Sequence, residues 1–225
     1  MKKIGVVIAQ RKECENLFTK LGNCEIIDLY AGFSVNKFVV GGKEVYFTES
    51  GVGEIKAAIA TQKLIDIFNV DVVINFGVAG GLKRGTRGNI YIVKGVCHYD
   101  FDTTPIDNTG RGRYLDFPSA VIDTDSDMID LLKSLAPSAE LAVCASGDKF
   151  ICDDKIKEGL AEEFGATICE MESAGVLITS KLANKPCAVI KIVSDDSADP
   201  EDYYRFLQKM TDDLNVLIEK FLNII

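Results

Sequence analysis

The stretch Cys187-Ala-Val-Ile-Lys-Ile-Val-Ser-Asp-Asp196 is the most informative part of this chain. Its first seven residues are apolar apart from one lysine, which is typical of a strand buried on both faces of a sheet. Two acids, Asp195 and Asp196, follow at its end. Because ligands of open α/β sheets bind outside the carboxyl ends of the strands, we expect Asp195 at the mouth of a binding site.

A second acidic segment, Ile168-Cys-Glu-Met-Glu-Ser-Ala174, precedes this strand. The apolar residues 174–178 follow it, so we expect the segment to open a largely buried helix. Acids in a first turn are stabilised by about 0.3–1 kcal/mol, so Glu170 and Glu172 have a capping or surface role in one interpretation. In the other they belong to a site, because a buried carboxylate must be paired or bound to a ligand.

Composition describes an ordinary globular chain. It has 225 residues, 47% hydrophobic and 26% charged, which predicts one domain spanning residues 1–225. The formal net charge is -9 and no cluster of lysines and arginines stands out, so we expect no nucleic acid and no membrane partner. Seven dispersed cysteines without a CxxC pair, and a single histidine, predict reduced core thiols and no metal site.

The first residues mimic a signal peptide, but their apolar part is short and leads directly into charged residues. We interpret residues 3–9 as the first strand. No stretch approaches the roughly 18 apolar residues of a membrane span, so we expect a cytoplasmic protein.

Strand-like and helix-like segments alternate along the chain, which predicts an α/β sandwich with a mixed sheet. The strand-like segments are residues 3–9, 45–49, 72–76, 141–145 and 186–193, and the helix-like segments are residues 13–21, 54–68 and 128–135. A last helix shows Phe206, Met210, Leu214, Leu217 and Phe221 at steps of three and four, and we expect it to pack on the sheet.

Further segments complete a pattern with the two acidic ones. They are Glu13 after the first strand, Ser50-Gly-Val-Gly-Glu-Ile-Lys-Ala-Ala58, Asn75-Phe-Gly-Val-Ala-Gly-Gly81 and Ala145-Ser-Gly-Asp-Lys-Phe-Ile151. Over residues 4–199 this order resembles the 5'-methylthioadenosine/S-adenosylhomocysteine nucleosidases of the nucleoside phosphorylase superfamily. The resemblance implies a three-layer α/β/α sandwich with a central mixed, twisted sheet. It also implies a hydrolase of methionine salvage that releases adenine from 5'-methylthioadenosine and/or S-adenosylhomocysteine, without metal or cofactor.

The resemblance also implies the catalytic residues. Asp195 is the general acid toward purine N7, and Glu13 is the base that activates water. From spacing alone, Glu15 is an alternative to Glu13. The turn at residues 50–53 is either a plain strand-to-helix connection or a wall of the pocket.

Other side chains are expected to bind the substrate. They are Glu172, Met171, Phe150, Ile151, Val78, Ser194 and Lys191. By resemblance, Glu172 binds the ribose hydroxyls with Met171 packed against the sugar. Phe150 stacks on the purine, and the backbone of Ile151 meets the edge of the base, which agrees with the use of aromatic faces and backbone groups in such pockets.

Three positions depart from the family. Val78 replaces a hydroxyl residue that helps to hold water, and Lys191 replaces an arginine, keeping its charge but losing the bidentate fork. Tyr99 replaces a histidine, so that the neighbouring His98 is offset and is expected to be structural. These departures keep open a non-catalytic nucleoside-binding homologue. A phosphate-dependent phosphorylase is the other alternative, although the glycine-rich turns lack the arginines that a phosphate dianion needs.

The polar, turn-rich residues 99–117 form the longest loop-like interval. In the resembled family this region reaches the neighbouring subunit of a homodimer and helps to wall its active site. We therefore expect a homodimer completed by the loop at residues 102–114. The interface is also expected to include apolar residues of the helix at residues 54–68, whose alanine-rich stretch 57–60 permits close approach.

Overall fold

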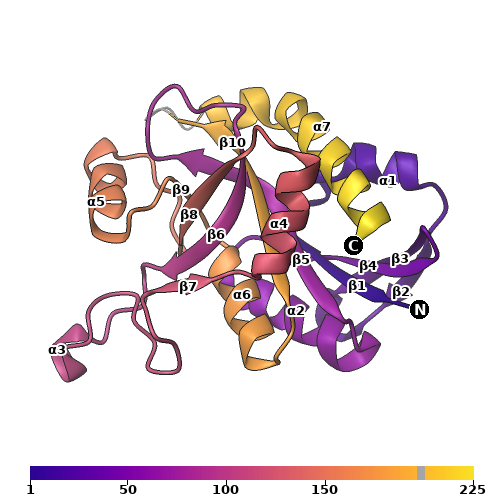
Figure 1. Cartoon of the computed structure of the whole chain (residues 1–225), viewed down its shortest axis with the longest axis horizontal. Helices are drawn as coiled ribbons and strands as arrows, with labels where there is room; N and C mark the ends of the chain where they lie inside the picture. The colour runs from indigo at the N-terminus through magenta and orange to yellow at the C-terminus, as the bar shows by residue number, and fades with distance from the viewer. Residues whose placement is uncertain (197–200) are drawn as a thin grey trace.

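The computed structural model describes residues 1–196 and 201–225 and has helices on both faces of one sheet (Figure 1). The strands are β1 (Lys3–Ile8), β2 (Glu25–Asp28), β3 (Ser34–Val40), β4 (Lys43–Glu49), β5 (Val72–Gly81), β6 (Ile90–His98), β7 (Val121–Asp123), β8 (Glu140–Ser146), β9 (Ile168–Glu170) and β10 (Cys187–Asp195). The helices are α1 (Glu15–Leu21), α2 (Glu54–Phe68), α3 (Thr104–Asp107), α4 (Ser126–Leu135), α5 (Asp154–Phe164), α6 (Ser173–Leu182) and α7 (Glu201–Ile224), with short 3₁₀ turns η1 (Arg11–Glu13) and η2 (Tyr30–Gly32).

The sheet is mixed and part of it closes on itself. One arm runs β2-β3-β4-β1-β5, and β5 then pairs with both β10 and β9. Because β10 also pairs with β6, β6 with β8 and β8 with β9, these five strands form a ring. β1, β4, β5 and β10 are mutually parallel, so their carboxyl ends meet at one edge of the sheet. That edge is where a ligand site is expected.

Two hydrophobic cores flank the sheet and account for its three layers. α1, α4 and α7 cover one face, where Leu17, Leu132 and Phe221 are buried, and α2 and α6 cover the other with Leu64 and Leu177. The predicted three-layer α/β/α sandwich is thus confirmed. In α7 the predicted apolar positions Leu214, Leu217 and Phe221 are buried, whereas the side chains of Phe206 and Met210 lie outside the described residues. Within the described ranges, no helix has the length and apolar character to span a membrane.

The structure corrects two local predictions. The helix expected over residues 13–21 begins as the 3₁₀ turn η1 and continues as α1 from Glu15. The segment expected to open a helix at Ile168 instead starts as strand β9, which pairs with β5 and β8, and α6 begins only at Ser173. A strand of three residues is too short to show a periodicity, so its pairing partners determine its conformation.

Candidate active site

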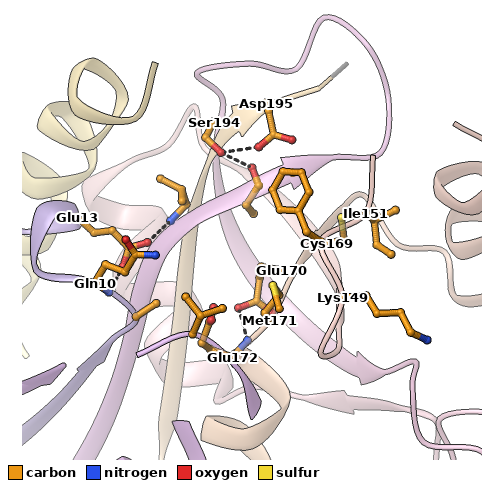
Figure 2. A pocket seen from close by; sticks show the side chains of 16 residues that line it. Gln10, Glu13, Lys149, Ile151, Cys169, Glu170, Met171, Glu172, Ser194 and Asp195 are labelled. Atoms are coloured by element: carbon orange, nitrogen blue, oxygen red, sulfur yellow. Dashed lines mark hydrogen bonds between the residues drawn. The ribbon is translucent and has the colours of Figure 1, made fainter. Parts of the chain in front are cut away.

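A cavity of about 380 Å³ lies at the carboxyl edge of the parallel strands. It is lined by residues from the ends of β1, β5 and β10, from the loop after β8, and from the junction of β9 with α6. Its size is within the usual range of small-molecule sites. Figure 2 shows three carboxyl groups at separate positions around it, those of Glu13, Glu172 and Asp195.

Glu13 is held in place by backbone N–H groups. It is only 3% exposed, and its carboxylate accepts hydrogen bonds from the N–H of Gln10 (3.1 Å) and, more weakly, of Val78 (3.5 Å). Burial raises the pKa of this carboxyl above its usual value, and the charge of Lys191 partly offsets the rise. A raised pKa suits a general base near neutral pH. Glu15, the alternative by spacing, does not line the cavity and is exposed.

The two adjacent aspartates have different environments. Asp195 faces the cavity and accepts a hydrogen bond from the Ser194 hydroxyl (2.7 Å). Burial raises the pKa of Asp195, as a proton donor requires. Asp196 instead accepts hydrogen bonds from the N–H of Thr86 (2.8 Å) and Arg87 (3.2 Å). Burial alone would raise the pKa of Asp196, but these N–H groups hold that pKa below its usual value.

Ser194 is linked to the charge of Asp195. Its hydroxyl oxygen lies 2.7 Å from Asp195 Oδ1 and 3.4 Å from the carbonyl oxygen of Ala79. Because a hydroxyl has one proton, it donates to the carboxylate when Asp195 is ionised and can turn to Ala79 when Asp195 is protonated. Ser194 can thus adapt to either protonation state of Asp195.

Lys191 is the predicted substrate residue that lies off the cavity wall. Its side chain is buried, and its Nζ donates to Glu170 Oε2 at 2.8 Å. Lys191 lies four residues before the end of β10, about 13 Å inside the sheet at the usual rise of a strand. The structure therefore places it behind the site, where it neutralises Glu170.

Glu170 lies on the cavity wall but its oxygens are occupied. Besides Lys191, it accepts hydrogen bonds from the Ser146 hydroxyl (2.6 Å) and from the N–H of Glu172 (3.1 Å) and Ser173 (3.0 Å). Although burial acts to raise the pKa of Glu170, Lys191 and these donors hold it below the usual value. Glu170 is therefore an ionised support for the start of α6.

Glu172 is the N-cap residue of α6 and reaches across to α2. Its Oε1 accepts a hydrogen bond from the N–H of Gly53 at 3.0 Å. Burial and the nearby charge of Glu170 raise the pKa of Glu172 to about 8. Because the preceding Val52 lines the cavity, the turn at residues 50–53 is a wall of the pocket as well as a connection.

One side of the cavity is largely apolar. Phe150, Ile151, Met171 and Cys169 line it, and Phe150 is 49% exposed. An aromatic ring on a cavity wall can stack on a planar ligand. All the predicted site residues except Lys191 thus lie on one wall or another of this cavity.

Seven further wall residues were not predicted as site residues, namely Ala9, Gln10, Val52, Ala79, Gly80, Lys149 and Cys169. Most of them lie next to predicted residues or within the segments quoted from the sequence, so adjacency was the signal available. Cys169 could not be distinguished from the core cysteines, and burial raises the pKa of its thiol to about 12.

The positions that depart from the family have defined environments. Val78 contributes a wall surface and its N–H. Tyr99 is buried, with its hydroxyl 3.4 Å from the carbonyl oxygen of Lys149. His98 does not line the cavity, and its Nδ1 lies 2.7 Å from the Tyr114 hydroxyl. His98 therefore anchors the loop at residues 99–117 to the sheet.

That loop and α2 bear on the expected interface. α3, at the tip of the loop, projects from the body of the molecule at the lower left of Figure 1. Within the alanine-rich stretch 57–60 of α2, expected to permit close approach of a second subunit, Ala57 and Ala60 are buried in the core between the sheet, α2 and α6, whereas Ile59 is exposed. Ile55, Ile59 and Ile67 are exposed apolar residues of α2.

Comparisons with known proteins identify the family and the fold. Residues 3–223 match the model of the phosphorylase superfamily. A 5'-methylthioadenosine/S-adenosylhomocysteine nucleosidase of Buchnera aphidicola is 30% identical over 99% of this chain and 97% of its own. The Helicobacter pylori futalosine hydrolase structure covers 100% of this chain and 98% of its own, with a TM-score of 0.94 and 27% identity. The H. pylori 5'-methylthioadenosine/S-adenosylhomocysteine nucleosidase with butyl-thio-DADMe-Immucillin-A covers 100% and 99%, with a TM-score of 0.92 and 27% identity.

Proposed function

This chain belongs to the phosphorylase superfamily and, within it, to the family of 5'-methylthioadenosine/S-adenosylhomocysteine nucleosidases, and on that premise we propose that it hydrolyses the N-glycosidic bond of one or both of these nucleosides. The observation that carries the proposal is the convergence of Glu13, Glu172 and Asp195 on one cavity. All three have a pKa raised by burial. Groups with such shifts cluster at catalytic sites.

The three carboxyl groups divide the work of glycosidic cleavage. In the proposed mechanism Asp195 donates its proton to purine N7, so that the base leaves as a neutral molecule. Glu172 binds the ribose hydroxyls and stabilises the cationic sugar, against which Met171 packs. Glu13 takes a proton from the water that attacks the sugar from the opposite face. The same division between acid, charge stabiliser and activated water operates in glycoside hydrolysis.

The purine is proposed to bind along the apolar side of the cavity. Phe150 would stack on the base, and the backbone of Ile151 would meet its edge, while Cys169 and Ser194 would lie beside it. Apolar walls with a few polar groups give affinity and orientation in this way. Binding of the nucleoside would also exclude water from the three carboxyl groups and so strengthen their electrostatic effects.

Water is favoured over phosphate as the nucleophile by the cations near the cavity. Among the described lining residues there is no arginine, and the lining lysine, Lys149, is paired with Asp100 at 2.8 Å. Arg11 lies over the Phe18 ring and donates to Asn36, and Lys191 is paired with Glu170. A phosphorylase would need cations that converge on a dianion.

The 5' group of the substrate is a second question. Because the futalosine hydrolase structure matches this fold as well as the nucleosidases do, futalosine is the second candidate substrate. All these candidate substrates are cleaved at an N-glycosidic bond. They differ in the group that the rest of the cavity wall must accommodate.

We propose in addition that the enzyme acts as a homodimer, with the loop at residues 102–114 of one subunit completing the pocket of the other. The projecting α3 and the outward-facing Ile55 and Ile59 support this arrangement. A role in methionine salvage and a cytoplasmic location stay predictions from the sequence.

One assay separates the alternatives. The purified protein is incubated with methylthioadenosine, S-adenosylhomocysteine or futalosine, with and without phosphate, and free base and sugar product are measured. We expect free base and an unphosphorylated sugar at a rate independent of phosphate. Release only with phosphate would indicate a phosphorylase, and binding without release would indicate a nucleoside-binding homologue.

A further inference from the structure

A buried glutamate that the mechanism does not use lies behind the cavity. Glu54 is the first residue of α2, and its side chain is buried between α2, β8 and α6. Its Oε1 is hydrogen-bonded to the Ser146 hydroxyl, and its Oε2 accepts from the N–H of Gly175. On its other side the same hydroxyl lies 2.6 Å from Glu170 Oε1. One serine hydroxyl thus bridges two carboxyl groups.

The number of protons in this bridge can be counted. A serine hydroxyl has one proton to donate and two lone pairs that accept. The Ala174 N–H occupies one lone pair at 3.0 Å, so the Ser146 hydroxyl can donate to only one carboxylate. If both carboxyl groups were ionised, the carboxylate that did not receive the hydroxyl proton would face the remaining lone pair of Ser146 at hydrogen-bond distance. Such a contact between two lone pairs is repulsive. One of the two carboxyl groups must therefore carry a proton.

The surrounding donors determine which one. Glu170 has the ammonium of Lys191 at 2.8 Å and two N–H groups of α6, all of which favour its charged form. Glu54 is hydrogen-bonded to Ser146 and Gly175, and within the described residues no cation forms an ion pair with it. The proton therefore resides on Glu54, which donates to Ser146, and Ser146 donates to Glu170. The proton and both lone pairs of the Ser146 hydroxyl then have partners.

From this chain of contacts we infer that Glu54 is a positioning residue for the reaction: as a neutral acid it locks the start of α2 to the start of α6 and thereby holds the Glu172 carboxyl toward the substrate. Two links join these helix ends, Glu54 to Gly175 and Gly53 to Glu172. Because Glu172 is itself the N-cap of α6, loss of the first link would loosen its carboxyl. The inference rests on the proposed function where it concerns substrate.

Ionisation of Glu54 has a defined sign. Burial and the nearby charge of Glu170 raise the pKa of Glu54 to about 8. The facing titratable and charged groups are Glu170 from β9, Glu172 from α6, Asp148 after β8, Tyr99 after β6, Tyr114 of the loop and Lys191 of β10 behind Glu170. Above pH 8 the second negative charge at Ser146 breaks the bridge, so substrate binding weakens as pH rises. Ionisation of Glu172 acts oppositely, since a carboxylate accepts ribose hydroxyls better than a neutral acid does.

The experiment compares the wild type with Glu54→Gln. The amide NH₂ can donate to Ser146 and the amide oxygen can accept from Gly175, so the variant preserves the neutral bridge. We expect kcat and KM at pH 7 within about twofold of the wild type. Because Glu172 titrates in both proteins, the two KM values are compared as a ratio. From pH 7 to pH 9 the KM of the wild type relative to that of Glu54→Gln should rise about tenfold, as expected when a group with a pKa of about 8 must be protonated in the wild type alone. Ser146→Ala should raise KM already at pH 7. Adding Glu54→Gln to Ser146→Ala should then change KM no further.

Thermal unfolding provides a readout that needs no substrate. A carboxyl group whose pKa is raised on folding stabilises the protein below its unfolded pKa, and this stabilisation is lost as pH rises toward the folded pKa. The wild-type Tm should therefore fall between pH 5 and pH 8 more steeply than that of Glu54→Gln. Glu158→Gln, an exposed change in α5, is the matched control and should follow the wild type.

Each outcome is decisive. Equal Tm slopes in wild type and Glu54→Gln, or loss of activity of Glu54→Gln at pH 7, would show that Glu54 does not act as a neutral acid. A ratio of wild-type KM to variant KM that stays constant from pH 7 to pH 9 would remove Glu54 from the positioning of Glu172. If no nucleoside is cleaved, the proposed function fails, and the Tm comparison still decides where the proton resides.

Discussion

Single residues determine the chemistry proposed for this cavity, and the two neighbouring aspartates test it most directly. Asp195→Asn cannot donate a proton, so we expect kcat to fall by about 10²–10⁴ with little change in Tm. Asp196→Asn should leave kcat nearly unchanged and lower Tm, because Asp196 accepts the N–H groups of the turn at Thr86 and Arg87. Steady-state kinetics and thermal unfolding of both variants are the measurements. A larger loss of kcat at Asp196 would transfer the acid role to it.

Glu13 and Glu172 should separate catalysis from binding. Glu13→Gln removes the base that acts on water, so kcat should fall at least a hundredfold while the affinity for the nucleoside changes little. Glu172→Gln should also raise KM, because its carboxylate is proposed to bind ribose in the ground state. Calorimetric titration of the inactive variants with substrate measures the affinity. Full turnover in Glu13→Gln would contradict the proposed mechanism.

The pH profile follows from the same residues. Glu13 acts as the ionised base, so kcat/KM should rise with pH through its raised pKa. Asp195 acts as the protonated acid, so kcat/KM should fall as pH exceeds its own raised pKa. The expected profile is a bell. In Glu13→Gln the residual kcat/KM should no longer rise with pH on the acidic side of the bell. That result would assign the acidic side of the profile to Glu13.

At the scale of elements, the contact of α2 with α6 controls the site. A Cβ on Gly175 would lie 2.3 Å from the carbonyl oxygen of Glu54, so the two helix ends can meet only with glycine there. We expect Gly175→Ala to cost roughly 1–3 kcal/mol of stability and to raise KM by displacing Glu172. Gly159→Ala in α5 is the control, since its Cβ would meet nothing within 4 Å and alanine should stabilise the helix by about 0.5–1 kcal/mol. Denaturant unfolding measures the change in the free energy of unfolding for both variants. If both variants were destabilised, or both stabilised, close packing at Gly175 would not be the reason for the glycine there.

At the scale of the whole molecule, the expected dimer can be tested through the outward face of α2. Ile55, the second residue of α2, is 72% exposed. An apolar residue there is suited to a subunit contact, and a charge would oppose it. We expect Ile55→Glu to shift the protein from dimer to monomer in analytical ultracentrifugation and to reduce activity. A fully active monomeric wild type would show that one chain completes the pocket by itself.

The sequence by itself determined the architecture and most of the cavity wall. The apolar strand from Cys187, the amphipathic helices and the glycine-rich turns express periodicities and local preferences, which are properties of neighbouring residues. Because the parallel strands end at one edge, motifs at their ends are predicted to converge, and Glu13, Val78 and Asp195 do so. Resemblance to a family then supplied roles that the residues alone left open.

Tertiary structure alone decided which charges pair. Lys191 was expected in the pocket but lies behind it, paired with Glu170 of the cavity wall. Glu54, which received no role from the segment 50–58 that contains it, shares a serine hydroxyl with that same carboxylate. Likewise β9 is a strand because it pairs with β5 and β8, although its three residues carry no readable period. These outcomes depend on distances between groups far apart in the chain and on their burial. Such quantities have no local signature, since the desolvation of a carboxyl group is set by everything that packs around it.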